Sequence, residues 1–277
     1  MKKLISGIAL SMLLPLVLAA TPAAQAQAPK PPLAFGIVPQ QSASRLAKVW
    51  APLLAEISRR SGVALAFRTA PSIPVFEQRL GLGEYDLAYM NPYHYVVFHA
   101  AGYSAFAKEQ DRRIKGILVV RKDSPYRTPA DLAGKAVAFP APAAFAASIL
   151  PRAEFTRRKI PIETKYVASH DSVYRAVASG LQAAGGGIRR TFEATPAKIR
   201  DTLRILTETP AYTPHAFAAH ARVPPETFAK VLAAMESLAT DETGRRLLAP
   251  LAFKGIVAAR DKEWDDIRAL DIHILER

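Results

Sequence analysis

The sequence contains no cysteine among its 277 residues. This excludes a disulfide framework, an iron–sulfur cluster, a cysteine nucleophile and any thiolate zinc site. Acidic residues are fewer than basic ones, 24 against 37, which leaves a net charge of +13. Because half of the residues are apolar, the bulk of the chain has enough apolar surface to build a core and is not disordered.

Motifs of the common catalytic and nucleotide sites are also missing. The sequence has no G-x-S-x-G, H-E-x-x-H, P-loop or G-x-G-x-x-G pattern. His94 and His99 are five residues apart, as are His215 and His220, whereas two imidazoles on one helix face need a spacing of four. The run Gly185–Gly187 indicates close backbone packing rather than a phosphate loop. We therefore expect no enzyme activity, no metal and no cofactor.

The first 26 residues have the pattern of a cleavable secretory signal peptide. A positive start is followed by the apolar run Leu4–Ala20 and by the small residues of Ala24–Ala26. A membrane anchor is the alternative, but the run has only 17 residues and contains Pro15. We expect cleavage near Gln27 and a mature protein in the periplasm.

Export limits which partners the basic charge can indicate. Removing Lys2 and Lys3 leaves 35 − 24 = +11. A basic chain often binds nucleic acid, but an exported protein meets little of it, and no basic run is long enough for a nucleic-acid tail. An anionic ligand, an acidic membrane surface or a generally basic proteome remain as explanations. We expect no nucleic-acid partner.

Strand-like and helix-like segments alternate twice along the mature chain. Apolar residues spaced at helical intervals predict one helix face, formed by Leu46, Val49, Trp50, Leu53, Leu54 and Ile57. The other predicted helices are 74–81, 92–100, 143–158, 171–179, 225–239, 241–249 and 261–270. The predicted strands are 33–38, 63–67, 85–90, 114–120, 136–139, 164–168 and 203–206, and the apolar segment 214–219 is expected to be extended. This rhythm predicts an α/β fold with mostly parallel sheets.

The repeat of the rhythm predicts two lobes rather than one wide sheet. The first lobe is expected to contain 33–119 together with 215–277, and the second 120–214. Segments near 108–122 and 207–219 are expected to cross between the lobes. A cleft between such lobes, at the carboxyl ends of the strands, is a natural ligand site.

Five segments together resemble one family, the substrate-binding proteins of phosphate, phosphite and phosphonate ABC transporters. The segments are Phe35–Gln40, Tyr85–Pro92, Arg121–Pro125 with Pro129–Lys135, Ser169–Asp171 with Ala176–Gly180, and Phe253–Ile256 with Trp264–Arg268. The resemblance implies a type 2 periplasmic binding protein fold, with two Rossmann-like lobes joined by two crossing strands. It also implies capture of a small oxyanion by hinge closure, delivery to a membrane permease, and a monomeric protein.

The resemblance implies an anion site at the start of a helix. The family has a D-P-N-S-T-S-G loop there, and the matching stretch here is Ala141–Ala147. Ala144, Phe145 and Ala146 stand where the family has hydroxyl residues. Backbone N–H groups at a helix start still attract an anion, but this wall is expected to be more apolar than in the family.

Other candidate site residues come from the same match. His170 matches directly, while Arg190 and His215 stand where some members have acidic residues that hold an amine. A guanidinium at that place favours an oxyanion over an ammonium group. Tyr93 and His94 follow a predicted strand and are expected to face the cleft. The alternatives are a solvated helix face for Arg190 and ordinary packing or hinge roles for the others.

A second function fits the same sequence. A protein of this fold can present a bound ligand to a membrane sensor kinase instead of a permease. The sequence does not separate transport from signalling.

Overall fold

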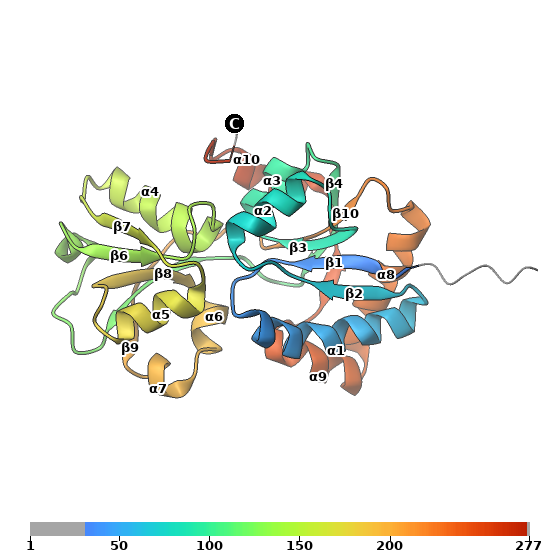
Figure 1. Ribbon diagram of the computed structural model, residues 1–277, viewed down its shortest axis with the longest axis horizontal. Coiled ribbons are helices and arrows are strands. Elements are labelled where there is room, and N and C mark those ends of the chain that lie inside the picture. Colours follow the sequence, from blue (N-terminus) through green and yellow to red (C-terminus); the bar gives the residue numbers. More distant parts are fainter. Residues whose placement is uncertain (1–30, 276–277) are drawn as a thin grey trace, which may run out of the picture. The chain divides into compact units, whose positions relative to one another are not determined.

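The computed structural model describes residues 31–275, and the predicted signal peptide lies outside them. Two separate β-sheets, of six and five strands, form two lobes with helices on both sides of each sheet (Figure 1). This is the predicted α/β architecture, and no sheet continues from one lobe into the other within the described residues. The expectation of mostly parallel sheets is wrong, because β10 and β5 are antiparallel to both of their neighbours and β11 is antiparallel to β4.

The sheet of the first lobe mixes parallel and antiparallel strands in the order β11-β4-β10-β3-β1-β2. Strand β1 pairs in parallel with β2 and β3, whereas β10 is antiparallel to β3 and β4. The strands are β1 (Leu33–Ile37), β2 (Leu65–Arg68), β3 (Leu87–Met90), β4 (Tyr103–Glu109), β10 (Ala216–His220) and β11 (Ile256–Ala258). Strands from both ends of the chain therefore build one lobe.

Helices cover both faces of this sheet, with α1 and α9 on one side and α2 and α3 on the other (Figure 1). Helix α1 buries the predicted apolar face, and it ends at Gly62, whose φ of 69° suits glycine. The helices of this lobe are α1 (Ala43–Ser61), α2 (Ile73–Gly81), α3 (Pro92–Phe98), α8 (Pro225–Ser237), α9 (Glu242–Leu248) and α10 (Asp265–Arg268).

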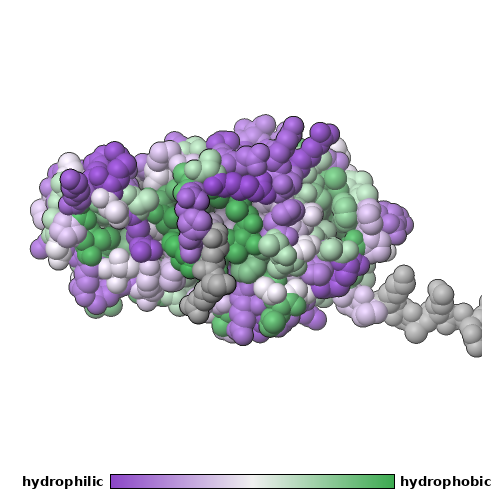
Figure 2. All heavy atoms as spheres, turned by 90° about the horizontal axis from the view of Figure 1, so that it is seen from above, coloured by the Kyte–Doolittle hydropathy of each residue, from purple (hydrophilic) through white to green (hydrophobic). Residues whose placement is uncertain are grey.

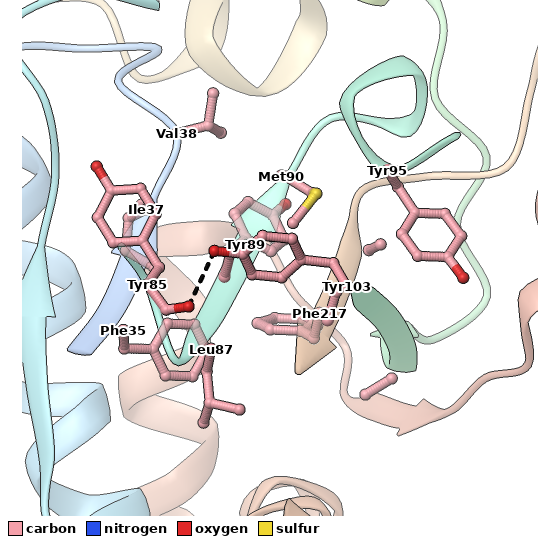
Figure 3. Packing of buried hydrophobic residues seen from close by; sticks show 14 of the residues in the cluster. Phe35, Ile37, Val38, Tyr85, Leu87, Tyr89, Met90, Tyr95, Tyr103 and Phe217 are labelled. Atoms are coloured by element: carbon pink, nitrogen blue, oxygen red, sulfur yellow. Dashed lines mark hydrogen bonds between the residues drawn. The ribbon is translucent and has the colours of Figure 1, made fainter. Parts of the chain in front are cut away.

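Aromatic side chains fill the core of the first lobe (Figure 3). The rings of Trp50 and Tyr89 lie 4.8 Å apart, as do those of Tyr89 and Phe217. The buried Tyr103 hydroxyl donates to the carbonyl of Tyr85 at 2.9 Å. Large buried rings contribute much of a core's stabilisation, so the aromatic core stabilises the end of β3 that leads into the cleft.

The second lobe has a sheet of order β7-β6-β8-β5-β9. Its strands are β5 (Gly116–Arg121), β6 (Ala136–Phe139), β7 (Glu163–Tyr166), β8 (Ala184–Ile188) and β9 (Leu203–Glu208). Helix α4 lies on one side and α5 on the other (Figure 1). The helices are α4 (Leu150–Arg157), α5 (His170–Ala178), α6 (Arg189–Glu193) and α7 (Ala197–Arg200).

The glycine run of the sequence forms strand β8, where backbone approaches closely. A Cβ on Gly186 would lie 2.0 Å from the carbonyl oxygen of Ala147, and one on Gly187 would lie 2.1 Å from the Tyr174 hydroxyl. Gly116 on β5 is equally close to the carbonyl oxygen of Ala146. Gly116 and Gly186 let the start of the cleft helix rest directly on the sheet, and Gly187 makes room for Tyr174 of α5. This is the close packing that the sequence predicted for the glycine run.

Two connections join the lobes, one between β4 and β5 and the other between β9 and β10. An antiparallel bridge between Ile114 and Tyr212 ties the two connections together. Both connections lie inside the predicted crossing segments. Strand β5 of the second sheet begins at Gly116, before the predicted lobe boundary at 119. The predicted boundaries at 119 and 214 stay predictions.

Several elements differ from the prediction. Strands β4, β8 and β11 were not predicted, because their residues lack a clear period of two. The predicted helix 143–158 begins at Phe145 with a π-helical turn, Phe145–Ile149, before α4. The predicted 261–270 helix is a 3₁₀ turn, Asp261–Trp264, followed by the short α10.

On the face shown in Figure 2, hydrophilic and hydrophobic residues both reach the surface. Such mixing is ordinary, because a folded protein cannot cover all of its surface with polar atoms. Between residues 31 and 275, no helix is both long and apolar enough to span a membrane.

Candidate functional site

A small cavity lies between the two lobes and brings together five of the predicted site residues. Ala144, Phe145, Ala146, His170 and His215 line it. Its other lining residues are Val38, Gln40, Ile73, Asn91, Ile114, Ala147 and Ile188. The cavity volume is about 10 Å³, room for roughly one water molecule. The lobes are therefore closed on each other around the site.

The second lobe supplies an apolar wall, the helix start at Ala144–Ala147. All four of its side chains are buried, and the Phe145 ring packs edge-on against Tyr212 at 5.6 Å. The first turn of any helix leaves N–H groups without a partner inside the helix. The wall therefore combines apolar side chains with backbone donors, as predicted for this stretch.

The opposite wall is polar. The Gln40 amide, which follows β1, lies 3.1 Å from Nε2 of His215. The His215 ring stacks on Tyr89, with centroids 4.9 Å apart and planes 15° apart. Asn91 caps α3 and also donates from Nδ2 to the carbonyl of Ala143 at 3.1 Å. These amide and imidazole groups supply hydrogen bonds without a fixed charge.

His170 belongs to the same polar set, although it comes from the second lobe. Its Nδ1 lies 2.9 Å from the Thr191 hydroxyl, and its backbone N–H donates to the Gln40 carbonyl at 3.1 Å. Burial, with a smaller effect of Arg190, lowers the pKa of His170 to about 3. Burial also lowers the pKa of His215 well below its ordinary value. Both imidazoles are therefore neutral at pH 7.

Arg190, on α6, lies beside the cavity and reaches across to the first lobe. Its guanidinium donates to the Tyr89 hydroxyl at 2.9 Å and to Oε1 of Gln40 at 3.2 Å. It also pairs with the Glu109 carboxylate at 3.5 Å and lies over the Phe253 ring, 5.4 Å from its centroid. Burial opposes its charge, but Tyr89 and Glu109 together raise the pKa of Arg190 above its ordinary value. Arg190 is therefore not on a solvated helix face.

The structure does not bring Tyr93 and His94 to the cavity. The Tyr93 hydroxyl accepts from the backbone N–H of Leu275 at 3.0 Å. Nε2 of His94 lies 2.9 Å from the Glu77 carboxylate, in the buried contact between α2 and α3. Because Asn91 caps α3, the helix turns the next residues into the first lobe and away from its edge.

Four residues of this region were missed by sequence reasoning: Gln40, Tyr89, Asn91 and Glu109. Gln40, Tyr89 and Asn91 lie inside the quoted family segments, at strand ends, and that position could have identified them. Glu109 had no sequence signal, because its importance depends on a buried contact with Arg190, which lies 81 positions away (190 − 109). Within residues 31–275, no group of three His, Asp or Glu side chains is placed to hold a metal ion.

Comparisons with known proteins agree with this geometry. A family model described as ABC transporter, phosphonate, periplasmic substrate-binding protein matches residues 35–264. A search of curated proteins found no significant match.

Solved structures share the fold at low identity. A binding-protein component of an ABC phosphonate transporter from Pseudomonas aeruginosa has a TM-score of 0.80 at 18% identity, covering 87% of this chain and 85% of that one. PhnD1 from Prochlorococcus marinus, in complex with methylphosphonate, has a TM-score of 0.79 at 16% identity, covering 86% and 96%. XAC2383 from Xanthomonas citri, bound to ATP, has a TM-score of 0.67 at 16% identity, covering 86% and 94%.

These neighbours are type 2 periplasmic binding proteins, and nothing in the comparisons favours the sensor alternative. The fold, the closed two-lobe site and the match over most of the chain agree. The chain belongs to the family of periplasmic substrate-binding proteins of ABC phosphonate transporters, which capture a small ligand and deliver it to a membrane permease.

Proposed function

We propose that this chain binds a small oxyanion, a phosphonate or a related compound, in the cavity between its lobes. The ligand contacts the helix start at Ala144–Ala146 on one side and Gln40, His170 and His215 on the other. Arg190 acts as a positioning residue, and Tyr93 and His94 take no part. The protein binds its ligand without converting it and works as a monomer that docks on its permease.

The observation that carries this proposal is the composition of the cavity wall. Gln40, Asn91, His170 and His215 line it, and no Asp, Glu, Lys or Arg is among its lining residues. Helix-start N–H groups and neutral polar side chains can donate to several oxyanion oxygens at once. An amine-bearing ligand would need a carboxylate, and the matched positions are Arg190 and His215 instead.

Arg190 acts on the ligand through Gln40. Its bond to Oε1 holds the Gln40 amide so that the NH₂ group faces His215 and the cavity. The Gln40 NH₂ group is thereby fixed as a donor before the ligand arrives. Such preorganisation raises affinity, because less conformational freedom is lost on binding.

The closed cavity is smaller than a phosphonate, so a ligand of several heavy atoms enters only when the lobes separate. Closure around the ligand brings the lobes together again, with the cavity wider than in the empty protein, so contacts such as those from Asn91 to Ala143 and from His170 to Gln40 re-form only as far as the ligand leaves room. Hinge closure on a ligand has this form.

Export by a cleavable signal peptide completes the proposal. The pattern over residues 1–26 supports it, together with the periplasmic location of the family. The N-terminal sequence of protein purified from the periplasm is expected to begin at or near Gln27, and a sequence that begins at Met1 would contradict cleavage.

Titration calorimetry tests the ligand site. Methylphosphonate and inorganic phosphate are titrated into the mature wild type, His170→Ala and the matched control Tyr93→Phe. We expect at least one of the two anions to bind the wild type and Tyr93→Phe equally, and His170→Ala to bind it at least about tenfold more weakly, since one hydrogen bond to a charged group is lost. Equal binding by all three proteins would remove His170 from the site. No binding of either anion to the wild type would reject the proposed ligand class.

A further inference from the structure

Arg190 and Glu109 form a buried pair of opposite charges that joins the lobes. Arg190 comes from α6, and Glu109 is the last residue of β4. The two side chains are only 11% and 4% exposed, and Nη1 lies 3.5 Å from Oε2. Each charge is therefore balanced by the other and not by solvent, so the pair adds no net charge to the region behind the cavity.

The cavity itself adds no fixed charge. The imidazoles of His170 and His215 are neutral, because burial lowers the pKa of each. Arg112 also pairs with Glu109, at 3.6 Å, but its side chain is 35% exposed. Arg113, Lys115 and Arg189 line the same outer cavity as Glu109 and are at least half exposed, so solvent screens these cations. The Tyr89 hydroxyl, whose pKa burial raises to about 12, stays protonated.

A buried site of zero net charge binds a singly charged anion and a doubly charged anion with different affinities. One charge can be met by helix-start N–H groups and by the Gln40 amide. A second charge has no partner, and burying an unpaired charge is costly. An oxyanion that keeps one proton also has an O–H donor, and a neutral imidazole can accept from it. His170 uses Nδ1 for Thr191, which leaves Nε2 for such a bond.

We propose that Glu109 is a specificity-determining residue that restricts the site to singly charged oxyanions, by neutralising Arg190, the largely buried arginine beside the cavity that could balance a second charge. This rests on the proposed function. The ligand class is then an oxyanion with one ionised oxygen, and a doubly ionised one is rejected.

The test compares two probes over pH 6 to 8.5 by titration calorimetry. Methylphosphonate loses its second proton in this region, whereas methanesulfonate carries one charge throughout. For the wild type we expect the methylphosphonate affinity to fall about tenfold per pH unit once the second proton is lost, since one bound proton is required. The methanesulfonate affinity, which reports any titration of the protein itself, is expected to stay flat.

Glu109→Gln, which keeps the side-chain volume, is expected to flatten the methylphosphonate profile to less than about threefold per pH unit, because Arg190 then balances the second charge. Glu208→Gln is the matched control, since Glu208 pairs with the exposed Arg189 and Lys115, and it is expected to keep the wild-type slope. A flat wild-type profile for methylphosphonate would overturn the proposal without any variant, and so would an unchanged slope in Glu109→Gln. Absence of binding of both probes at every pH would instead reject the proposed function.

Discussion

The two walls of the cavity differ in how they are built. The wall of the second lobe is the helix start Ala144–Ala147, whose side chains offer no hydrogen-bond donor, so its donors are backbone N–H groups. The polar wall consists of side chains, Gln40 and His215 of the first lobe with His170 of the second, and each is held by a hydrogen-bond partner. The structure of the apolar wall depends on how closely the backbone packs on the sheet. The structure of the polar wall depends on a network of polar side-chain contacts.

This difference shows where specificity can change. Backbone donors persist whatever side chains the loop carries. We therefore propose that the loop still binds an anion, more weakly than one that keeps the hydroxyl residues. The polar wall depends on side-chain identity, because Arg190 and His215 stand where the family resemblance implies carboxylates. We infer that the second wall decides which ligand is accepted.

The largest expected effect is a loss of stability when the packing beneath the apolar wall is disrupted. Gly186→Val would place a Cβ only 2.0 Å from the carbonyl oxygen of Ala147 and 2.7 Å from the Phe139 ring. Because backbone cannot easily move away, we expect a loss of more than about 4 kcal/mol in the free energy of unfolding. Urea denaturation measures it. Gly81→Ala, whose nearest neighbour would be 3.6 Å away, is the control and is expected to change stability by less than about 0.5 kcal/mol.

The second effect concerns the polar wall. Arg190→Met leaves Glu109 buried without its partner, and breaking a buried pair costs about 3 kcal/mol or more. Arg189→Met is the matched control, because Arg189 is about half exposed, and exposed pairs contribute about 0–1 kcal/mol. Chemical denaturation of both variants measures the difference. Equal losses would show that Arg190 is not part of a buried network.

The third effect is acid sensitivity of the polar wall. The pKa of His170 is lowered to about 3 in the folded protein, below the ordinary value of about 6.5. The unfolded chain therefore binds a proton first as the pH falls below 6.5, and stability decreases by up to about 1.4 kcal/mol per pH unit for this group. His170→Asn removes this contribution. Denaturation at pH 4, 5, 6 and 7 is expected to give a shallower slope for the variant, and identical slopes would contradict the buried neutral state.

The smallest effect restores a donor to the apolar wall. Ala146→Ser adds a hydroxyl at a position that lines the cavity. One added hydrogen bond contributes about 1 kcal/mol, so we expect methylphosphonate to bind up to about fivefold more tightly. Thermal shift and calorimetry measure it. Weaker binding would show that the wall is too tightly packed to accept the oxygen.

Much of the fold could be predicted from the sequence. The apolar face of α1, the strand residues of β1 and β3 and the glycines of β8 each carry a local signal. Strands β4 and β11 could not be predicted, because they are defined by pairing with distant segments and have no period of their own.

The site was predicted in part. The family resemblance points to the loop at Ala144–Ala146, to His170 and to His215 as candidates, and the structure places them in one cavity. The direction of the α3 side chains could not be predicted, because the Asn91 cap sets the rotation of the helix and so turns Tyr93 and His94 inward. The contact of Arg190 with Glu109 depends on closure of the lobes, which no local pattern encodes.

A double-mutant cycle on ligand affinity tests the central claim, that Arg190 acts on the ligand through Gln40. Methylphosphonate affinity is measured by calorimetry for the wild type, Arg190→Met, Gln40→Leu and the double variant, each first checked by circular dichroism for a native fold. Because the two residues belong to one network, we expect strong non-additivity, with the double variant little weaker than Gln40→Leu alone. If the two losses of binding free energy simply add, Arg190 does not work through Gln40 and the account of the polar wall is wrong.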